Sequence, residues 1–320
     1  MYQNNHLALH ASALYAVQKL LPGVVMTARY KNTLYALIYA QLLSVYGTHT
    51  ERTISFIMPC YNADRLEHAL ASIYQQKIDL PFEVVCCDDG STDDTFARLL
   101  KYKRNYPHLK VLRHATNKGA GAAANTCVKH SKGTLLYRLD SDNMLPEPEL
   151  EVINKLVQLL DSSGCDAAMI ETMVLFEGEK NIKALWRYEA PGNLCDLEHC
   201  ITVAHDPAMS GNFLMRREAF ERVGGYPEDH GSDTFRFGFK LYATGGKVAL
   251  LPGSWYWHFY NPHGYWWREQ KSGNNDLKAL ETVYEFRKMF TRTSQFYLQQ
   301  ALNQSGSVFQ LIHEKKLSLK

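Results

Sequence analysis

The sequence predicts an α/β fold in which a mostly parallel sheet is flanked by helices. Apolar runs of strand length alternate with helical patterns between residues 53 and 160. These runs are apolar throughout, which is typical of parallel strands covered by helices on both faces. Acidic and polar residues follow several of the runs, at the carboxyl ends where open parallel sheets bind ligands.

The elements of this pattern follow one another in order. Apolar runs predict strands over residues 53–58, 82–87, 109–113 and 134–139, and helical spacing predicts helices over 64–77, 91–102, 121–130 and 151–160. Asp64 and Glu67 stand at the spacing of a capping box, and Ser91 or Thr92 is expected to cap the next helix.

The pattern is less regular after residue 160. A short strand is expected over 247–251, an aromatic-rich segment runs from Trp255 to Trp267, and a helix is expected over 276–290. At the other end, residues 7–21 and 33–46 have helical spacing. We therefore expect an N-terminal helical extension (1–50), a central domain (51–267), and a C-terminal helical extension with a tail (268–320).

Bulk composition excludes several classes of protein. A net charge of +2 in 320 residues is too small to indicate nucleic acid as a main partner. The seven cysteines show no metal-ligand spacing and favour reduced thiols over a disulfide framework. No apolar run reaches the roughly 18 residues of a membrane span, so a cytoplasmic location is expected.

The first 50 residues contain no Asp or Glu, and their only Lys and Arg residues are Lys19, Arg29 and Lys31. Two interpretations stay open. The segment is either a helical pair packed on the main domain or on a second subunit, which makes an oligomer conceivable, or a face that rests peripherally on the anionic inner surface of a membrane.

Polar residues follow the first two predicted strands. Pro59-Cys-Tyr-Asn62 puts an aromatic ring and an amide at the mouth of the sheet, where Tyr61 could contact a base and Asn62 could cap the following helix. Asp88-Asp89-Gly90 follows the second strand. A turn with a helix cap explains Gly90 but not two adjacent carboxylates, which cost desolvation energy unless they have partners.

The fourth predicted strand, residues 134–139, is followed by Asp140-Ser141-Asp142-Asn143. Alternate carboxylates on a segment that leaves the sheet can converge on one hard cation, and oxygen ligands suit Mg²⁺ or Mn²⁺. Between these ends lies the turn Asn117-Lys118-Gly119, which could bring Lys118 near a phosphate. The glycine turn can equally be explained by tight packing, and it lacks the spacing of a Walker loop.

These strand ends, in this order, resemble those of inverting family 2 glycosyltransferases with the GT-A fold. A later segment, Ser210-Gly-Asn-Phe followed by Val223-Gly-Gly-Tyr-Pro, resembles the acceptor-side block of that family. The resemblance covers roughly residues 53–267. It implies donor-binding residues Pro59, Tyr61, Asn62, Asp89, Lys118, Asp140 and Ser141, with acceptor-binding residues Gly211, Asn212 and Trp257. It also implies metal ligands Asp142 and His258 for Mn²⁺ or Mg²⁺.

The family's catalytic base usually stands in a Glu-Asp pair before a helix. Here the resemblance assigns that role to Asp233, and Ser232 replaces the first acid. Ala124 stands where many members have arginine, and Lys118 is a candidate to compensate for that missing cation. His263 is an alternative to His258 as metal ligand. The aromatic segment 255–267 either stacks on acceptor sugars or forms core.

The resemblance implies a metal-dependent, non-processive transfer of a sugar to a hydroxyl of a glycan or lipid-linked acceptor. The expected donor is a UDP-sugar. Two alternatives stay open: a catalytically silent member that binds nucleotide sugar or acts as a scaffold, and a nucleotidyltransferase. The latter is expected to begin with a Gly-rich loop carrying Arg and Lys, which Pro59-Cys-Tyr-Asn62 does not supply.

Overall fold

The computed structural model describes residues 52–106, 108–178, 181–188, 190–197, 212–261 and 264–286. The expected N-terminal extension (1–50) lies outside these ranges, as does the tail beyond residue 286. Among the described residues, no helix is both long enough and apolar enough to cross a membrane.

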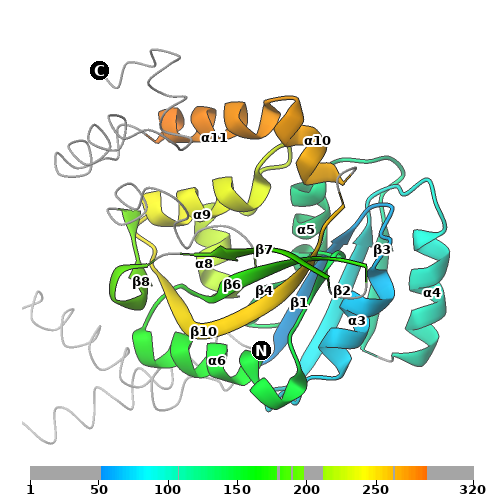
Figure 1. The fold of residues 1–320 in the computed structure, drawn as a ribbon, viewed down its shortest axis with the longest axis horizontal. Coiled ribbons are helices and arrows are strands. Elements are labelled where there is room, and N and C mark those ends of the chain that lie inside the picture. Colours follow the sequence, from blue (N-terminus) through cyan, green and yellow to red (C-terminus); the bar gives the residue numbers. More distant parts are fainter. Residues whose placement is uncertain are drawn as a thin grey trace, which may run out of the picture. The chain divides into compact units, whose positions relative to one another are not determined.

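The first half of the described chain is a succession of parallel strands and helices, as the sequence predicts. Its elements are β1 (Ile54–Cys60), α3 (Leu66–Tyr74), β2 (Phe82–Asp88), α4 (Thr95–Asn105), β3 (Leu109–Arg113), α5 (Ala120–Lys129) and β4 (Leu135–Arg138). β1 pairs in parallel with both β2 and β4, and β2 pairs in parallel with β3. The carboxyl ends of these strands therefore meet at one edge of the sheet (Figure 1).

The second half adds strands of mixed direction to the same sheet. Its elements are β5 (Asn143–Met144), η1 (Pro148–Leu150), α6 (Val152–Ser163), β6 (Ala167–Glu177), β7 (Asn181–Arg187), η2 (Pro191–Asn193), β8 (Leu194–Cys195), β9 (Phe213–Arg216), α8 (Arg217–Val223), α9 (Asp233–Ala243), β10 (Val248–Phe259), α10 (Tyr265–Lys271) and α11 (Asn274–Glu285). The strand order is β3-β2-β1-β4-β9-β6-β10-β5, with β7 paired to β6 and β8 to β10.

Helices cover both faces of this sheet. Figure 1 shows α8, α9, α10 and α11 on one side and α6 on the other. We call these the α9 face and the α6 face of the sheet. The GT-A-like α/β architecture expected from the sequence is thus present, although β9 runs antiparallel to its neighbours β4 and β6.

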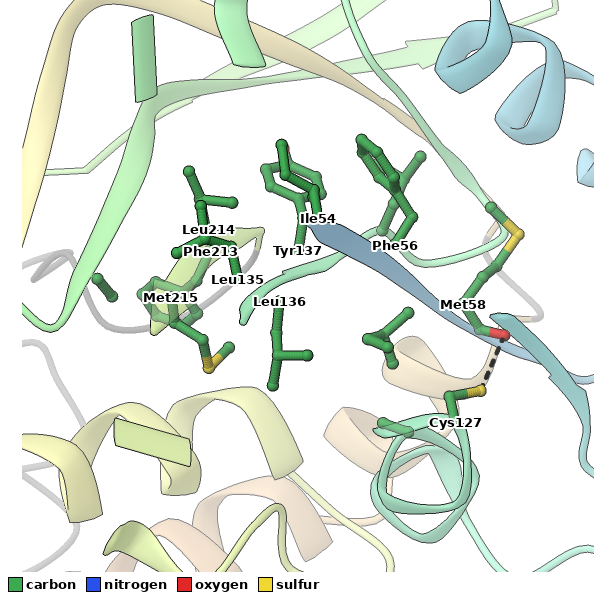
Figure 2. Packing of buried hydrophobic residues seen from close by; sticks show 14 of the residues in the cluster. Ile54, Phe56, Met58, Cys127, Leu135, Leu136, Tyr137, Phe213, Leu214 and Met215 are labelled. Atoms are coloured by element: carbon green, nitrogen blue, oxygen red, sulfur yellow. Dashed lines mark hydrogen bonds between the residues drawn. The ribbon is translucent and has the colours of Figure 1, made fainter. Parts of the chain in front are cut away.

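The core is built from the apolar strands on both faces of the sheet. Ile54 and Phe56 of β1 pack beside Tyr137 of β4, and Leu214 of β9 continues this layer (Figure 2). Because these side chains are almost fully buried, the ends of β1 and β4 are held rigidly, and so are the polar residues that follow them.

The structure corrects several sequence predictions in the strands and caps. β10 continues to Phe259 rather than ending at 251, and β6, β7 and β9 were not predicted. The capping predictions were wrong: α3 starts after Arg65 and α4 after Asp94, both without a side-chain cap. The Glu67 carboxylate pairs with Arg98 of α4 instead, which ties the two helices together.

Candidate active site

A buried arginine connects two of the predicted acidic residues. Arg138, the last residue of β4, donates from Nε to Oδ1 of Asp140 at 2.8 Å and from Nη1 to Oδ2 of Asp233 at 2.5 Å. Its guanidinium also lies over the ring of Tyr226, 4.7 Å from the centroid. The arginine is only 3% exposed, so burial of its charge is compensated by the two carboxylates.

The pKa values in this cluster reflect competition between burial and charge. Burial lowers the pKa of Arg138, but Asp140 and Asp233 together hold it well above its usual value. Burial raises the pKa of Asp140, the arginine opposes that effect, and the neighbouring carboxylates of Asp142 and Asp233 add to it. Two carboxylates, those of Asp140 and Asp233, therefore share one cation at the end of β4.

The second predicted acid after β4 lies beside the predicted histidine. Oδ1 of Asp142 is 3.8 Å from Nδ1 of His258, and the carbonyl of Asp142 accepts from the backbone N–H of Phe259. Nδ1 of His258 also lies 2.5 Å from Oδ1 of Asn143. The antiparallel pairing of β5 with β10 produces this arrangement, because it sets Asn143 opposite His258.

A chain of amides supports that histidine. Nδ2 of Asn143 donates to Oδ1 of Asn212 at 3.2 Å, so the amide oxygen of Asn143 faces His258. An oxygen at this position accepts the Nδ1 proton and leaves Nε2 with the lone pair that a metal requires. Asn212 is fully buried, and its Nδ2 has no partner among the described residues. Asn212 thus supports the histidine from within the core.

This donor set fits a divalent cation whose remaining ligands come from substrate. Within the described ranges, no three His, Cys, Asp or Glu side chains are grouped to hold a metal ion. Mg²⁺, however, is usually bound through one or two carboxylates together with waters and substrate phosphates. Asp142 is half exposed, so its carboxylate can be shared with a phosphate-bound cation, and His258 is the second candidate ligand.

A second cluster lies at the end of β2. Oδ1 of Asp89 is 2.6 Å from Nδ1 of His114, and Oδ2 accepts from the backbone N–H of Gly119 at 2.8 Å. The backbone N–H of Lys118 also points to this carboxylate. The buried Asp89 therefore holds the 117–119 turn in place, which explains a second acid in this position. Its predicted role in donor binding stays a prediction.

The donor-side residues after β1 are tied to the loop after β2. Oδ1 of Asn62 accepts from the backbone N–H of Thr92 at 3.0 Å, and the backbone N–H of Asn62 donates to Oγ of Ser91 at 2.9 Å. Asn62 has a left-handed φ of 46° and does not cap α3, contrary to expectation. These bonds position partly exposed Tyr61 at the carboxyl edge, beyond buried Pro59.

The remaining predicted site residues are exposed or partly exposed, outside the described ranges, or on the other face of the sheet. Ser141 is partly exposed between the two acids, and the side chain of Lys118 is exposed. Gly211 and His263 lie outside the described residues. Trp257 lies on the α6 face, where its ring meets Phe176 at 5.9 Å, whereas His258 lies on the α9 face. This placement favours core packing over acceptor contact for Trp257.

The two departures from the family pattern have structural consequences. Ser232 precedes α9, and its backbone N–H and Oγ both bond to Asn275 of α11. It therefore fastens α11 to the helix that carries Asp233. Ala124 is fully buried in the core, so an arginine would not fit there without repacking.

Sequence reasoning missed Arg138, His114, Asn143 and Tyr226. One signal was available for the first, since Arg138 interrupts the apolar run Leu135-Leu-Tyr-Arg-Leu139. A charge within a buried strand needs a partner. The others gave no signal, because their partners are distant in sequence: Asn125, for example, accepts from the backbone N–H of Tyr226, 101 residues later.

Comparison with known proteins agrees with this geometry. Residues 55–224, more than half of the chain, match the family described as Glycosyl transferase family 2. The chain belongs to this family. The putative glycosyltransferase EpsE of Bacillus subtilis (strain 168) is 29% identical over 177 residues, which cover 54% of this chain and 59% of that protein.

A further relative is UDP-Glc:alpha-D-GlcNAc-diphosphoundecaprenol beta-1,3-glucosyltransferase WfgD of Escherichia coli, 33% identical over 99 residues that cover 31% of this chain and 38% of that protein. The chain thus spans less than two thirds of the length of either relative.

Solved structures confirm the GT-A fold. TarS 1–349 of S. aureus in complex with UDP-GlcNAc has a TM-score of 0.58 at 19% identity, covering 83% of this chain and 72% of that one. The mannosyltransferase PcManGT from Pyrobaculum calidifontis, in complex with GDP-Man and Mn²⁺, has a TM-score of 0.52 at 20% identity, covering 88% and 87%.

Proposed function

We propose that this protein transfers a sugar from a nucleoside-diphosphate donor to a hydroxyl of a glycan or lipid-linked acceptor, with inversion at the anomeric carbon. The observation that carries the proposal is the contact of Arg138 with both Asp140 and Asp233. It brings the acid that follows β4 next to the acid that begins α9, although 93 residues separate them in the sequence. A displacement requires groups that bind the donor and a base that faces the acceptor, and we assign Asp140 to the donor side and Asp233 to the acceptor side.

In this mechanism Asp233 is the base. One of its oxygens, Oδ2, is held by Arg138, which leaves Oδ1 to receive the proton of the acceptor hydroxyl. The acceptor oxygen forms its bond to the anomeric carbon while the bond from that carbon to the diphosphate oxygen breaks. The diphosphate departs with the electron pair. A positioned base of this kind contributes typically about 10²–10⁴-fold to the rate.

Asp142 and His258 would hold a Mn²⁺ or Mg²⁺ ion at the diphosphate. When bound, the cation would supply positive charge to the departing group. UDP is the first choice of nucleotide, since WfgD is named for UDP-Glc and TarS was solved with UDP-GlcNAc. GDP is the second choice, since PcManGT was solved with GDP-Man.

A thermal-shift series tests the donor site. UDP, GDP, dTDP and their sugars are added to the full chain with Mn²⁺ or with chelator, and hydrolysis of each donor is followed in parallel. A ligand tenfold above its Kd adds about 1.4 kcal/mol of stability. We expect metal-dependent stabilisation by one nucleotide and its sugars. If no donor stabilises or is hydrolysed, the silent-scaffold alternative replaces this proposal.

The proposal also covers residues 1–50, which lie outside the described residues. We assign them peripheral contact with anionic lipid, because they carry three cationic residues (Lys19, Arg29 and Lys31) and no acidic ones. Sedimentation with anionic liposomes at low salt should pull down the full chain. If the chain stays in the supernatant, the contact with another part of the protein or with a second subunit is the better explanation.

A further inference from the structure

β7 exposes apolar side chains close to the candidate active site. The strand pairs with β6 along one side, and every residue from Asn181 to Arg187 is exposed. Leu185 and Trp186 are the largest apolar side chains at its centre, 67% and 41% exposed. Successive residues of a strand point to opposite faces, so these two mark different surfaces.

The register of the sheet identifies the face on which Trp186 lies. Met173 of β6 is paired both with Trp186 of β7 and with Tyr256 of β10, and Leu175 is paired both with Ala184 and with His258. Residues opposite one another in neighbouring strands share a face. Trp186 and His258 therefore both lie on the α9 face, and Leu185 lies on the α6 face.

A side-chain contact supports this assignment. Tyr188 follows Trp186 by two residues, and Tyr256 precedes His258 by two. Their hydroxyl oxygens lie 3.2 Å apart, so the side chains of both strands do reach over the same face of β6. Both tyrosines are buried, and they lie on the same face as Trp186.

The surface between Trp186 and His258 is partly open. On the α9 face, Met173 and Leu175 are partly exposed, whereas Val174 and Phe176 on the α6 face are buried. Ala184 is paired with Leu175, as His258 is, and its side chain covers this surface with only a methyl group. β7 and β10 are separated by β6, so their spacing is twice the roughly 4.8 Å between neighbouring strands, and Trp186 and His258 are offset by two residues along the strands. Their Cα atoms are therefore about 12 Å apart.

We propose that Trp186 is a stacking platform for a sugar ring of the acceptor, beyond the sugar whose hydroxyl reacts. This inference rests on the proposed function. An indole offers a large apolar face to the C–H surface of a pyranose and a polar edge to solvent. Trp186 lies about 12 Å from His258, the proposed ligand of the cation at the diphosphate, so the platform is on the same face as the site and at a distance that an acceptor of several sugars can span.

The charges on β7 favour a saccharide over a second copy of the chain. Lys183 stands in the middle of this open strand and pairs with Glu177, and Arg187 pairs with Glu171. Charged residues on an edge strand, lysine above all, oppose edge-to-edge pairing with another sheet. A neutral saccharide needs only the ring of Trp186 and the partly open surface beside it.

The test compares Trp186→Ala with Leu185→Ala, a matched control on the opposite face, and with Trp186→Phe, which retains a ring. The probes are cello- and chito-oligosaccharides of one to six sugars, which are neutral. The affinities of the wild type and all variants are measured by calorimetry. In the wild type and in Leu185→Ala, binding is also followed through the indole N–H resonance that Trp186→Phe removes from the spectrum. Turnover is then measured with each saccharide that binds and with the donor chosen by thermal shift.

We expect the longer saccharides to shift this resonance and Trp186→Ala to weaken their binding about tenfold. Binding of the monosaccharides and the effect of Leu185→Ala should be near wild type, and Trp186→Phe should retain most of the affinity. The inference is overturned if no saccharide shifts the resonance, if both alanine variants lose affinity equally, or if Trp186→Ala changes only the oligomeric state. Donor-induced stabilisation of Trp186→Ala separates these outcomes from failure of the proposed function, because that stabilisation does not involve β7.

Discussion

Arg138→Met removes the cation that Asp140 and Asp233 share and keeps the bulk of an unbranched side chain. The variant therefore leaves two carboxylates close together without their counter-ion, and it also removes the guanidinium from the ring of Tyr226. Because these contacts join β4 to α9, we expect the change to lower the free energy of unfolding of the whole domain.

The structure sets the size of this loss. Removing one partner of a buried ion pair costs about 3–5 kcal/mol. Asp233 is only 11% exposed but Asp140 is 30% exposed, so water can solvate part of the remaining charge. We therefore expect a loss near the lower limit, about 3 kcal/mol.

The loss should depend on pH. Burial already raises the pKa of Asp140, and Arg138 opposes that rise, so the variant should raise the pKa further. A carboxyl with a raised pKa in the folded state loses its contribution to stability as the pH rises from the ordinary aspartate value through the raised one. Arg138→Met should therefore be more destabilising at pH 7 than near the ordinary aspartate pKa, where a protonated Asp140 needs no cation.

Urea denaturation of the full chain, monitored by fluorescence at several pH values, measures both effects. Arg52→Met is the matched control, since the Arg52–Asp161 pair is exposed on both sides and should contribute less than about 1 kcal/mol. The triple variant with Asp140→Asn and Asp233→Asn should recover much of the loss. Equal losses for Arg138→Met and Arg52→Met, or a loss that does not change with pH, would refute the reasoning.

Three further changes test the site and its support. Asp233→Asn should lower turnover about 10²–10⁴-fold with donor-induced stabilisation intact, and near-normal turnover would remove Asp233 from the role of base. Asn143→Leu should weaken Mn²⁺ binding about 10–100-fold, as measured by calorimetry. Asn143→Asp retains a hydrogen-bond acceptor for His258, so it should lose less Mn²⁺ affinity. Equal losses of affinity in the two variants would contradict the support of His258 by Asn143. Gly121→Ala would force a methyl group against the carbonyl oxygen of Pro227, so it should cost about 1–3 kcal/mol. An unchanged melting temperature would show that α5 does not pack there as closely as observed.

Sequence patterns were most reliable in the parallel half of the sheet. β1, β2 and β4 are buried on both faces over most of their length, so each appears as a continuous apolar run between turn residues. They were least reliable for β7, where exposure of both faces removes the alternation that identifies a half-buried strand. The helix caps failed for a related reason, because side chains such as Glu67 found partners on another helix.

The sequence by itself determined which residue types stand at the carboxyl ends of the strands, because order along the chain and strand direction suffice for that. It placed Asp140 and Asp142 after β4, and the resemblance to the family placed Asp233 before a helix. Only the tertiary structure decided that Arg138 links Asp140 to Asp233, since such contacts depend on how β4 and α9 pack. It also decided that Trp186 rather than Trp257 shares a face with His258, because strand pairing sets the face.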